Sequence, residues 1–333
     1  MPSALQNWGE ILRTQRLSPG RVMDTVSRWL LITRASVISM TVLSGAIGGV
    51  LAAGNRNAHW GYFAMALLGL VLAHAAYNMI NDYLDVESGL DEAEYVRIQF
   101  APHPLLSGLI SKTGMVFAIA VVNLLLLGGL LYLTEVRGWP VAAFALLGLF
   151  VSVAQVAPPI QLKLRGMGEC GAALIWGPLM IGGIYFATTG GLEPWVVVAS
   201  LPYAALVTTV SIGRHIDNLE ADLRKGVQTL PVILGADRSL FLNQQLTILF
   251  FVFVVVLVLV GKVGVWTLLV FASVPLLWKV LKVYSRPRPE SAPPGYAFWP
   301  LWYAAWAFLL TRLAGGLFVV GLILDIVYPT RLG

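Results

Sequence analysis

The chain has 333 residues, of which 58% are hydrophobic and only 12% are charged, and its mean hydropathy is +0.78. One water-soluble core cannot bury so much apolar surface, which excludes an ordinary soluble domain and indicates a polytopic membrane protein. The basic residues behind the net charge of +5 are distributed as expected for a membrane protein, as described below. We therefore expect no nucleic-acid partner. The single cysteine, Cys170, excludes an intramolecular disulfide and a cysteine metal site.

Residues 1–28 precede the first long apolar run and are expected to form a cytoplasmic N-terminal segment. Leu5, Trp8, Ile11 and Leu12 share one face of a helix here, and arginines lie close by. This pattern predicts a short helix that lies on the membrane surface.

Nine apolar stretches then approach the roughly 20 residues that a helix needs to cross a bilayer. They lie at about 29–53, 60–85, 114–134, 139–156, 170–189, 194–215, 240–261, 264–283 and 297–325. Lipid tolerates only structures whose backbone hydrogen bonds are satisfied internally, so we predict an all-α fold. Residues 29–333 are expected to form one transmembrane domain of nine helices.

Lysines and arginines orient this bundle. If the N-terminus shares one side with the loops after even-numbered spans, that side holds sixteen of the 22 basic residues and the other side holds four, while Arg34 and Arg312 fall inside spans. The positive-inside rule makes the first side cytoplasmic. We expect a multi-pass protein of the cell membrane.

Nine of the 17 acidic residues gather in two short stretches on that same side. Six lie in "HAAYNMINDYLDVESGLDEAEY" (74–95), and three lie in "GRHIDNLEADLRKGVQTL" (213–230). Each stretch ends an even-numbered span, so the two can face one cavity.

Spacing in the first stretch favours a cation site. Asn78, Asp82 and Asp85 lie at i, i+4 and i+7 of a helix, and Asn81 pairs with Asp85 at i+4. Converging carboxylate and amide oxygens are ligands for hard cations such as Mg²⁺, which usually keeps positions open for phosphate oxygens and water. The alternative interpretation is a solvated acidic helix end.

Basic residues interleave with these acids: Arg97, Lys163, Arg165, Arg214, Arg224 and Lys225. Acids for a metal and bases for phosphate in one cavity indicate a diphosphate ligand. The alternative for Lys163 or Arg165 alone is simple marking of the cytoplasmic side.

"NMINDYLDVESGLD" resembles the first aspartate-rich motif of the UbiA superfamily of intramembrane prenyltransferases, in the variant of its 1,4-dihydroxy-2-naphthoate prenyltransferases. "DNLEADLRKGVQTLPVILG" is similar to the second motif, and "LKLRGMGE" and "GPLMIGGIYFATTG" to the middle segment. The resemblance runs from Trp29 to Gly235 and implies a fold of nine transmembrane helices around a central cavity.

The resemblance also implies the chemistry, in which an allylic polyprenyl diphosphate ionises and a small aromatic acceptor captures the prenyl cation. Its implied catalytic residues are Asp82, Asp85 and Asp222, and its Mg²⁺ ligands are Asp82, Asp85, Asp91, Asn218 and Asp222. We expect substrate contacts from Asn78, Asn81, Arg97, Lys163, Arg165, Arg214, Asp217 and Lys225. Tyr77, Tyr83, Trp176 and Tyr185 are candidates to shield the cation, although aromatic residues are also common in membrane spans.

Two departures from the family pattern matter. Asn218 stands where the second motif usually has its first Asp, and Asp217 precedes it. Asp217 and Asp222 are five residues apart, about 140° around a helix, so either the helix unwinds there or Asp217 acts elsewhere. Arg34 is followed by Ala35 where the family often has Pro, which predicts a less kinked entry to the first span.

Two histidines have minor candidate roles. The loop "PHPLLSG", which contains His103, is a candidate cap for the site, and His215 either orients the acceptor or its proton or only interacts with a helix end.

Two other functions stay open. A membrane terpene cyclase would ionise the same donor without an acceptor, and a transporter would use carboxylates at the membrane edge. Transporters are expected to show inverted repeats and broken helices near the midplane, whereas both acid clusters here lie on one side, which disfavours transport. The sequence leaves the donor chain length, the acceptor and the oligomeric state open.

Overall fold

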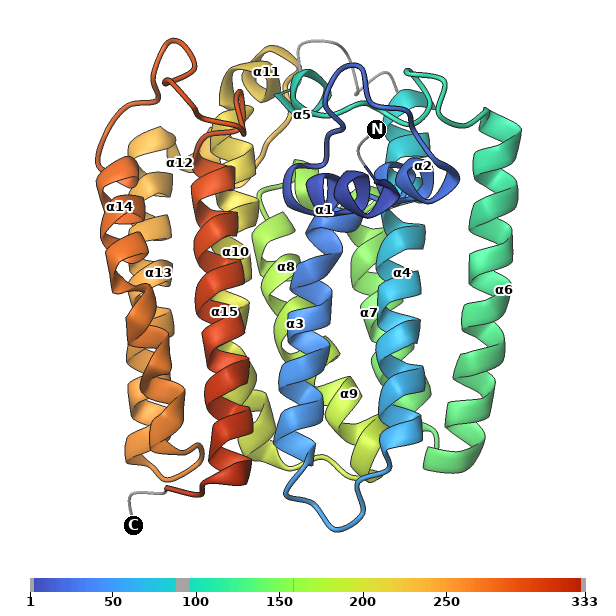
Figure 1. Ribbon diagram of the computed structural model, residues 1–333, viewed down its shortest axis with the longest axis vertical. Helices are drawn as coiled ribbons and strands as arrows, with labels where there is room; N and C mark the ends of the chain where they lie inside the picture. The colour runs from blue at the N-terminus through green and yellow to red at the C-terminus, as the bar shows by residue number, and fades with distance from the viewer. Residues whose placement is uncertain (1–2, 88–95, 158, 331–333) are drawn as a thin grey trace.

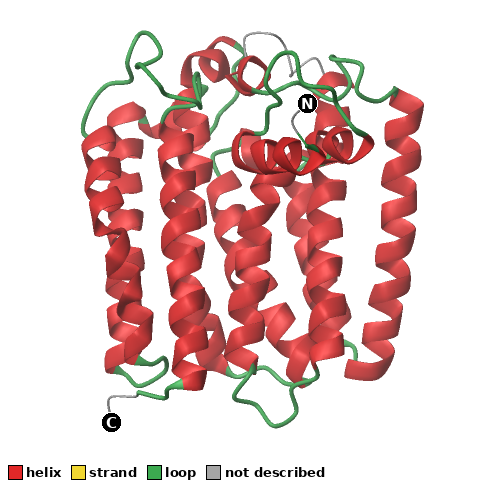
Figure 2. Cartoon of the chain, in the orientation of Figure 1, coloured by secondary structure: helices red, strands yellow, loops and turns green. Residues whose placement is uncertain are grey.

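The computed structural model describes residues 3–87, 96–157 and 159–330, and every regular element in this part of the chain is helical. Long helices run side by side between two ends that carry the loops (Figures 1 and 2). The spans are α3 (Ala35–Ala52), α4 (Trp60–Glu87), α6 (Lys112–Arg137), α7 (Pro140–Val156), α8 to α9 (Gly168–Thr189), α10 (Pro194–Asp217), α13 (Ala236–Leu259), η3 with α14 (Val265–Tyr284) and α15 (Tyr303–Val327).

The expected all-helical membrane fold is confirmed, and the count of nine is approximate. Eight of these spans are long and apolar enough to cross a membrane within the residues described. The remaining one, α7, is apolar but has only 17 residues.

Short elements gather at one end of the bundle, at the top of Figure 1, which we call the motif end. They are α1 (Ala4–Thr14), α2 (Thr25–Ile32), α5 (Val96–Phe100), α11 (Leu219–Arg224) and α12 (Leu230–Leu234), with the connections 101–111 and 285–302. The described chain ends at the opposite end of the bundle.

The first span is not the continuous helix expected from residue 29. α2 ends at Ile32 and α3 begins at Ala35, with Arg34 between them in the left-handed region at φ 54°. The less kinked entry expected from Ala35 is therefore wrong. Side chains from α4 hold this break open, because Asn78 Nδ2 donates to the Thr33 carbonyl at 2.9 Å and Asp82 pairs with the Arg34 guanidinium.

The fifth span is also interrupted. Between α8 (Gly168–Leu174) and α9 (Met180–Thr189) lies a wider turn, η2 (Ile175–Leu179), which contains Pro178 and a non-helical Gly177. Proline removes a helical donor and clashes with the preceding turn. Ser44 of α3 donates to the Trp176 carbonyl at 2.7 Å, so a neighbouring helix satisfies this backbone, as lipid requires.

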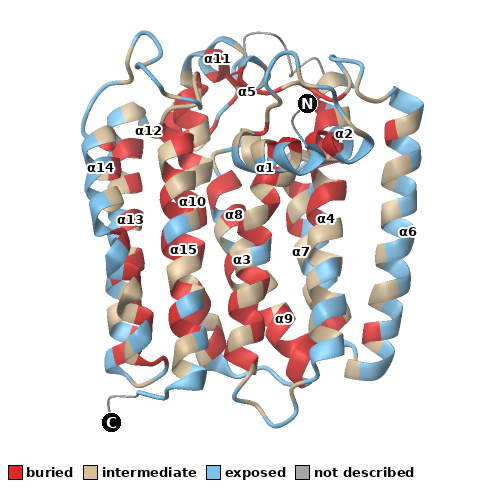
Figure 3. Cartoon of the chain, viewed as in Figure 1, coloured by how far each residue is buried: buried red, intermediate tan, exposed pale blue. Residues whose placement is uncertain are grey.

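α6 lies at the edge of the bundle (Figure 3), whereas α10 packs between other helices, chiefly α13 and α15. In the most apolar stretch of each helix, 72% of residues are buried in α10 and only 6% in α6. α10 touches the start of α15 at Gly213, where an added Cβ would stand 2.8 Å from the Ala304 nitrogen. The end of α10, which carries the second acidic motif, is thus fixed against α15.

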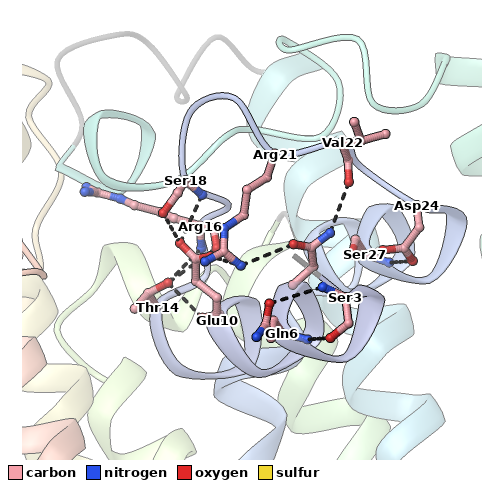
Figure 4. A network of polar contacts seen from close by, with 11 residues as sticks. Ser3, Gln6, Glu10, Thr14, Arg16, Ser18, Arg21, Val22, Asp24 and Ser27 are labelled. Atoms are coloured by element: carbon pink, nitrogen blue, oxygen red, sulfur yellow. Dashed lines mark hydrogen bonds and ion pairs between the residues drawn. The ribbon is translucent and has the colours of Figure 1, made fainter. Parts of the chain in front are cut away.

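The N-terminal segment packs across the motif end (Figures 1 and 4). Ser3 and Gln6 form a capping box at the start of α1, and Asn7 Nδ2 donates to the Val22 carbonyl at 3.0 Å. Asp24 caps α2, and hydrogen bonds from the Ser27 hydroxyl and N–H hold the pKa of this carboxyl well below its usual range.

The predicted apolar face of this helix is divided between two environments. Ile11 is fully buried, whereas Leu5 and Leu12 are exposed to 70% and 41%. Only part of the face therefore packs on the bundle, and the two leucines remain available to lipid.

Arg16 ties this segment to two distant connections. Its guanidinium donates to the Phe100 carbonyl and, at 2.7 Å, to the Trp299 carbonyl, and it lies 4.1 Å from the centre of the Phe100 ring. One side chain therefore joins the N-terminal segment, the end of α5 and the loop before α15.

Arg16→Ala is expected to lower the free energy of unfolding by ~2 kcal/mol, because two carbonyls lose a charged donor and the ring loses its cation. Thermal unfolding in detergent measures the effect. Arg13→Ala is the matched control, because Arg13 is an exposed arginine near the end of α1, three residues before Arg16. Equal melting temperatures for the two variants would contradict the role assigned to Arg16.

Candidate active site

The two acidic motifs meet at the motif end. α5 begins soon after the first motif, and its first N–H, from Val96, donates to Asn218 Oδ1 of the second motif at 3.1 Å. A short backbone bridge between Arg165 and Gln228 joins the fourth connection to the segment after α11. The start of α5 and the fourth connection thus both contact the segment 218–228.

The last two turns of α4 present the first motif. Asn81 Nδ2 donates to Asp85 Oδ2 at 2.6 Å, and Lys163 Nζ lies 3.9 Å from the same oxygen. Asn81 and Asp85 are both buried, while Lys163 is partly exposed. One oxygen of the Asp85 carboxylate thus contacts both the Asn81 amide and the Lys163 ammonium group.

Asp82 has a different environment from the one predicted. Both of its carboxylate oxygens face the Arg34 guanidinium, and His103 Nε2 lies 3.4 Å from Oδ1. The Asp82 side chain is completely buried. A buried ion pair is stable only when its charged groups are well aligned and hydrogen-bonded. Asp82 thus braces the α2–α3 break and the loop of His103, which does reach the first motif.

Asn78 also binds protein and not the region between the motifs. Its amide is committed to the Thr33 carbonyl, and the residue is buried. Asn78 thus supports the α2–α3 break, and its substrate contact stays a prediction.

The helix of the second motif breaks at Asn218, which is one of the two arrangements predicted from the spacing of Asp217 and Asp222. α10 ends at Asp217, Asn218 has φ −100° and ψ 5°, and α11 starts at Leu219. Asn218 Nδ2 donates to the Arg214 carbonyl at 3.0 Å. Asp222 is buried and accepts from the Thr229 hydroxyl at 3.3 Å.

Asp217 turns away from Asp222 and binds the start of α15. Its Oδ2 accepts from the N–H groups of Trp302 and Ala304 at 3.0 and 3.1 Å, and its Oδ1 accepts from that of Tyr303 at 3.0 Å. These donors have no partner within their own helix. Both oxygens thus contact the start of α15, and the substrate contact of Asp217 stays a prediction.

Of the predicted basic residues, some lie beside the acidic motifs and others lie nearer the surface. Lys163 lies beside Asp85, and Arg214 Nη2 lies 3.3 Å from His215 Nε2. Arg165 is exposed and donates to the Pro159 carbonyl at 2.7 Å, and Lys225 is partly exposed just after α11. Asp91 and the side chain of Arg97 lie outside the described residues.

The site contains a buried pair that the sequence pattern did not predict. Glu169 Oε1 lies 2.6 Å from His215 Nδ1, and both side chains are about 4% exposed. Glu169 belongs to the quoted "LRGMGE", but a single acid in a short loop gives no signal of burial. Arg34 was likewise identified only as a charge inside a span.

The aromatic candidates do not all reach the site. Tyr77 lies within electrostatic range of Arg34, Asp85 and Arg214, which places it between α4 and α10. Trp176 packs edge-on to His74 at 5.6 Å between ring centres.

The other two aromatic candidates lie elsewhere. Tyr185 donates to Glu193 at 3.3 Å at the opposite end of the bundle, and Tyr83 packs against a separate cluster that contains Met115 of α6. Of the four candidates, Tyr77 is thus the one that lies near Asp85 and Arg214.

The donor set fits Mg²⁺ better than a transition metal. Among the described residues no three His, Cys, Asp or Glu side chains converge on one point. Mg²⁺ needs only one or two carboxylates when substrate phosphates and water supply the other ligands. Asp85 and Asp222 are buried carboxylates, one in each motif, and with Asn81 and Asn218 they offer only oxygen ligands of the kind that Mg²⁺ prefers.

Comparisons with known proteins identify the family of this chain. Residues 42–302 match the UbiA prenyltransferase family. The chain is 26% identical over 261 residues to the 1,4-dihydroxy-2-naphthoate octaprenyltransferase of Bacillus subtilis, which covers 78% of this chain and 81% of that protein. It is also 26% identical over 277 residues to the 2-carboxy-1,4-naphthoquinone phytyltransferase of Synechocystis, which covers 79% and 84%.

Solved structures share the fold. A UbiA homolog from Archaeoglobus fulgidus bound to GPP and Mg²⁺ superposes with a TM-score of 0.59 at 17% identity, covering 87% of this chain and 99% of that one. A UbiA homolog from Aeropyrum pernix superposes with a TM-score of 0.63 at 15% identity, covering 86% and 98%. With a family match over most of its length, this chain belongs to the UbiA prenyltransferase family and is a multi-pass membrane prenyltransferase.

Proposed function

We propose that this prenyltransferase moves a prenyl group from an allylic polyprenyl diphosphate to an electron-rich aromatic acceptor of the dihydroxynaphthoate type, with Mg²⁺ as cofactor. The observation that carries the proposal is the cluster of Asn81, Asp85 and Lys163, which lies at the same end of an apolar bundle as the second motif. Such a site can hold a diphosphate at the end of the bundle while the prenyl chain lies among the helices.

Asp85 and Asp222, with Asn81 and Asn218, would hold Mg²⁺, whose charge favours departure of the diphosphate when it is bound. Lys163 and Arg214 would neutralise the phosphate oxygens by direct hydrogen bonds. The undescribed Asp91 and the side chain of Arg97 keep their expected roles in this proposal, as metal ligand and phosphate contact.

Asp82 is assigned a positioning role here, since Arg34 and His103 already engage its carboxylate. Lys225 and Arg165 lie further out, where they would meet the incoming diphosphate.

In the proposed reaction the bond between the prenyl C1 and the diphosphate oxygen breaks, and both electrons leave with the diphosphate. A ring carbon of the acceptor then forms a carbon–carbon bond to C1 and loses a proton. The faces of Tyr77 and Trp176 would stabilise the intervening allylic cation, and the bundle would exclude water that would otherwise capture it.

We further propose that the motif end faces the cytoplasm, because most lysines and arginines lie on that side, and that α1 rests in the membrane interface through Leu5 and Leu12. The relatives named for naphthoate prenylation and the structure with bound GPP and Mg²⁺ support the donor, the metal and the acceptor class.

Purified protein with Mg²⁺ and radiolabelled geranyl diphosphate should release diphosphate slowly alone and at least about tenfold faster with 1,4-dihydroxy-2-naphthoate. Ionisation is reversible while the cavity holds both fragments, so net release depends on a nucleophile. The measurement is labelled product in the organic phase together with free diphosphate.

Three outcomes separate the candidate functions. Release that depends on the aromatic acceptor supports the transferase. Fast release from the donor alone with a cyclised hydrocarbon product would instead make the protein a terpene cyclase. No donor binding, even with Mg²⁺, would contradict both enzymatic functions and favour transport.

A further inference from the structure

A buried three-residue chain connects α8 to the phosphate side of the candidate site. Glu169 Oε1 lies 2.6 Å from His215 Nδ1, and His215 Nε2 lies 3.3 Å from Arg214 Nη2. Glu169 and His215 are nearly excluded from solvent, whereas Arg214 is partly exposed. The chain thus runs from a buried carboxylate to a cation at the edge of the cavity.

Donor and acceptor chemistry determines the state of the histidine. A guanidinium has only N–H donors, so His215 Nε2 must accept and carries no proton. His215 Nδ1 then carries the proton and donates it to the Glu169 carboxylate. The imidazole is therefore neutral with its tautomer fixed from the Glu169 side, a common arrangement for residues that orient another group.

The position of Arg214 relates the Glu169–His215–Arg214 contacts to the binding of an anion. Arg214 and Asp85 both lie within electrostatic range of Tyr77, and Lys163 lies within electrostatic range of His215. Arg214 is therefore on the same side as the Asp85–Lys163 pair. An unrestrained arginine there has many rotamers, and fixing one in advance reduces the entropy lost on binding an anion.

We propose that Glu169 and His215 are positioning residues that fix the Arg214 guanidinium for the donor diphosphate. The inference deepens the proposed function and rests on it for the identity of the anion. Glu169 acts through His215, and His215 acts through Arg214. The second carboxylate oxygen of Glu169 is buried without a hydrogen-bond donor among the described residues, so its histidine contact is the one that holds it.

Two conservative variants break the chain at different links. Glu169→Gln keeps the size but lets His215 adopt the other tautomer, whose Nε2–H would repel Arg214. His215→Asn keeps a donor near Glu169 but removes the acceptor that faces Arg214. Each should raise the KM for geranyl diphosphate about tenfold, as loss of an outer-shell partner does at other sites, and leave the KM for the acceptor unchanged.

The decisive measurement is a double-mutant cycle. Arg214→Ala alone should raise the donor KM further, and adding His215→Asn or Glu169→Gln to it should change nothing more, because both act through the missing guanidinium. Isothermal titration of inorganic diphosphate with Mg²⁺ should give the same pattern in Kd. Glu193→Gln, which alters a hydrogen-bonded acid at the far end of the bundle, is the matched control.

Different outcomes test the inference and the proposed function separately. Effects of Arg214→Ala and His215→Asn that multiply in the donor KM, or a rise in both substrates' KM with a lower melting temperature, would overturn the positioning role. Wild-type protein without acceptor-dependent turnover would refute the proposed function instead, and the diphosphate titration would still decide whether His215 acts through Arg214.

Discussion

Asp85→Asn and Asp222→Asn should each reduce turnover by more than about a thousandfold while the protein still inserts and purifies normally. Each change removes one anionic oxygen ligand without changing side-chain size. Asn81 can still donate to the amide oxygen of residue 85, and the Thr229 hydroxyl can still donate to that of residue 222. The fold thus keeps its hydrogen bonds, and the metal and diphosphate lose theirs.

Turnover with geranyl diphosphate and 1,4-dihydroxy-2-naphthoate over a range of Mg²⁺ concentrations measures this effect. Glu220→Gln is the matched control, because Glu220 is an exposed acid of the same short helix and should be neutral. A variant of Asp85 or Asp222 that turns over near the wild-type rate would remove that residue from the site.

The all-helical membrane bundle could be predicted from the sequence because a membrane span depends on few properties of its own segment. A span needs length and apolar composition, and both can be counted without knowledge of any neighbour. The breaks at Arg34 and at Gly177 could not be counted in this way. They depend on Asn78 and Asp82 in one case and on the contact with α10 in the other, and these are tertiary contacts.

The same limit applied to the acids. Helical spacing correctly placed Asn81 beside Asp85, because a contact at i+4 is local. Spacing also grouped Asp82 with them, yet Asp82 lies on the side that faces Arg34. Helical spacing shows which residues share one face of a helix. It does not show which charged side chain from another helix will contact that face.

Asp217 illustrates this limit most clearly. Its position in an acidic motif favoured a substrate contact, and only the return of the chain as α15, some eighty residues later, gives its carboxylate another partner. Glu169 is the opposite case, because nothing local marks it and its partner comes from α10.

Asp217→Ala should therefore reduce stability and not chemistry. The N-cap residue of α15 is Trp302, whose indole cannot accept a hydrogen bond, so Asp217 caps this helix from another part of the chain. Its removal leaves three N–H groups without an acceptor, two of them buried, and we expect the free energy of unfolding to fall by ~3 kcal/mol. Thermal unfolding in detergent measures the loss, with Asp237→Ala, an exposed acid in the first turn of α13, as control.

The result separates two explanations of the second motif. If Asp217 only fixes α15, the folded fraction of Asp217→Ala should bind inorganic diphosphate with the wild-type Kd, and Asp217→Asn should have intermediate stability because one carbonyl oxygen remains as an acceptor. An unchanged melting temperature with lost diphosphate binding would return Asp217 to the substrate. The break at Asn218 favours the first outcome, since a helix that ends there directs residues 217 and 222 to different partners.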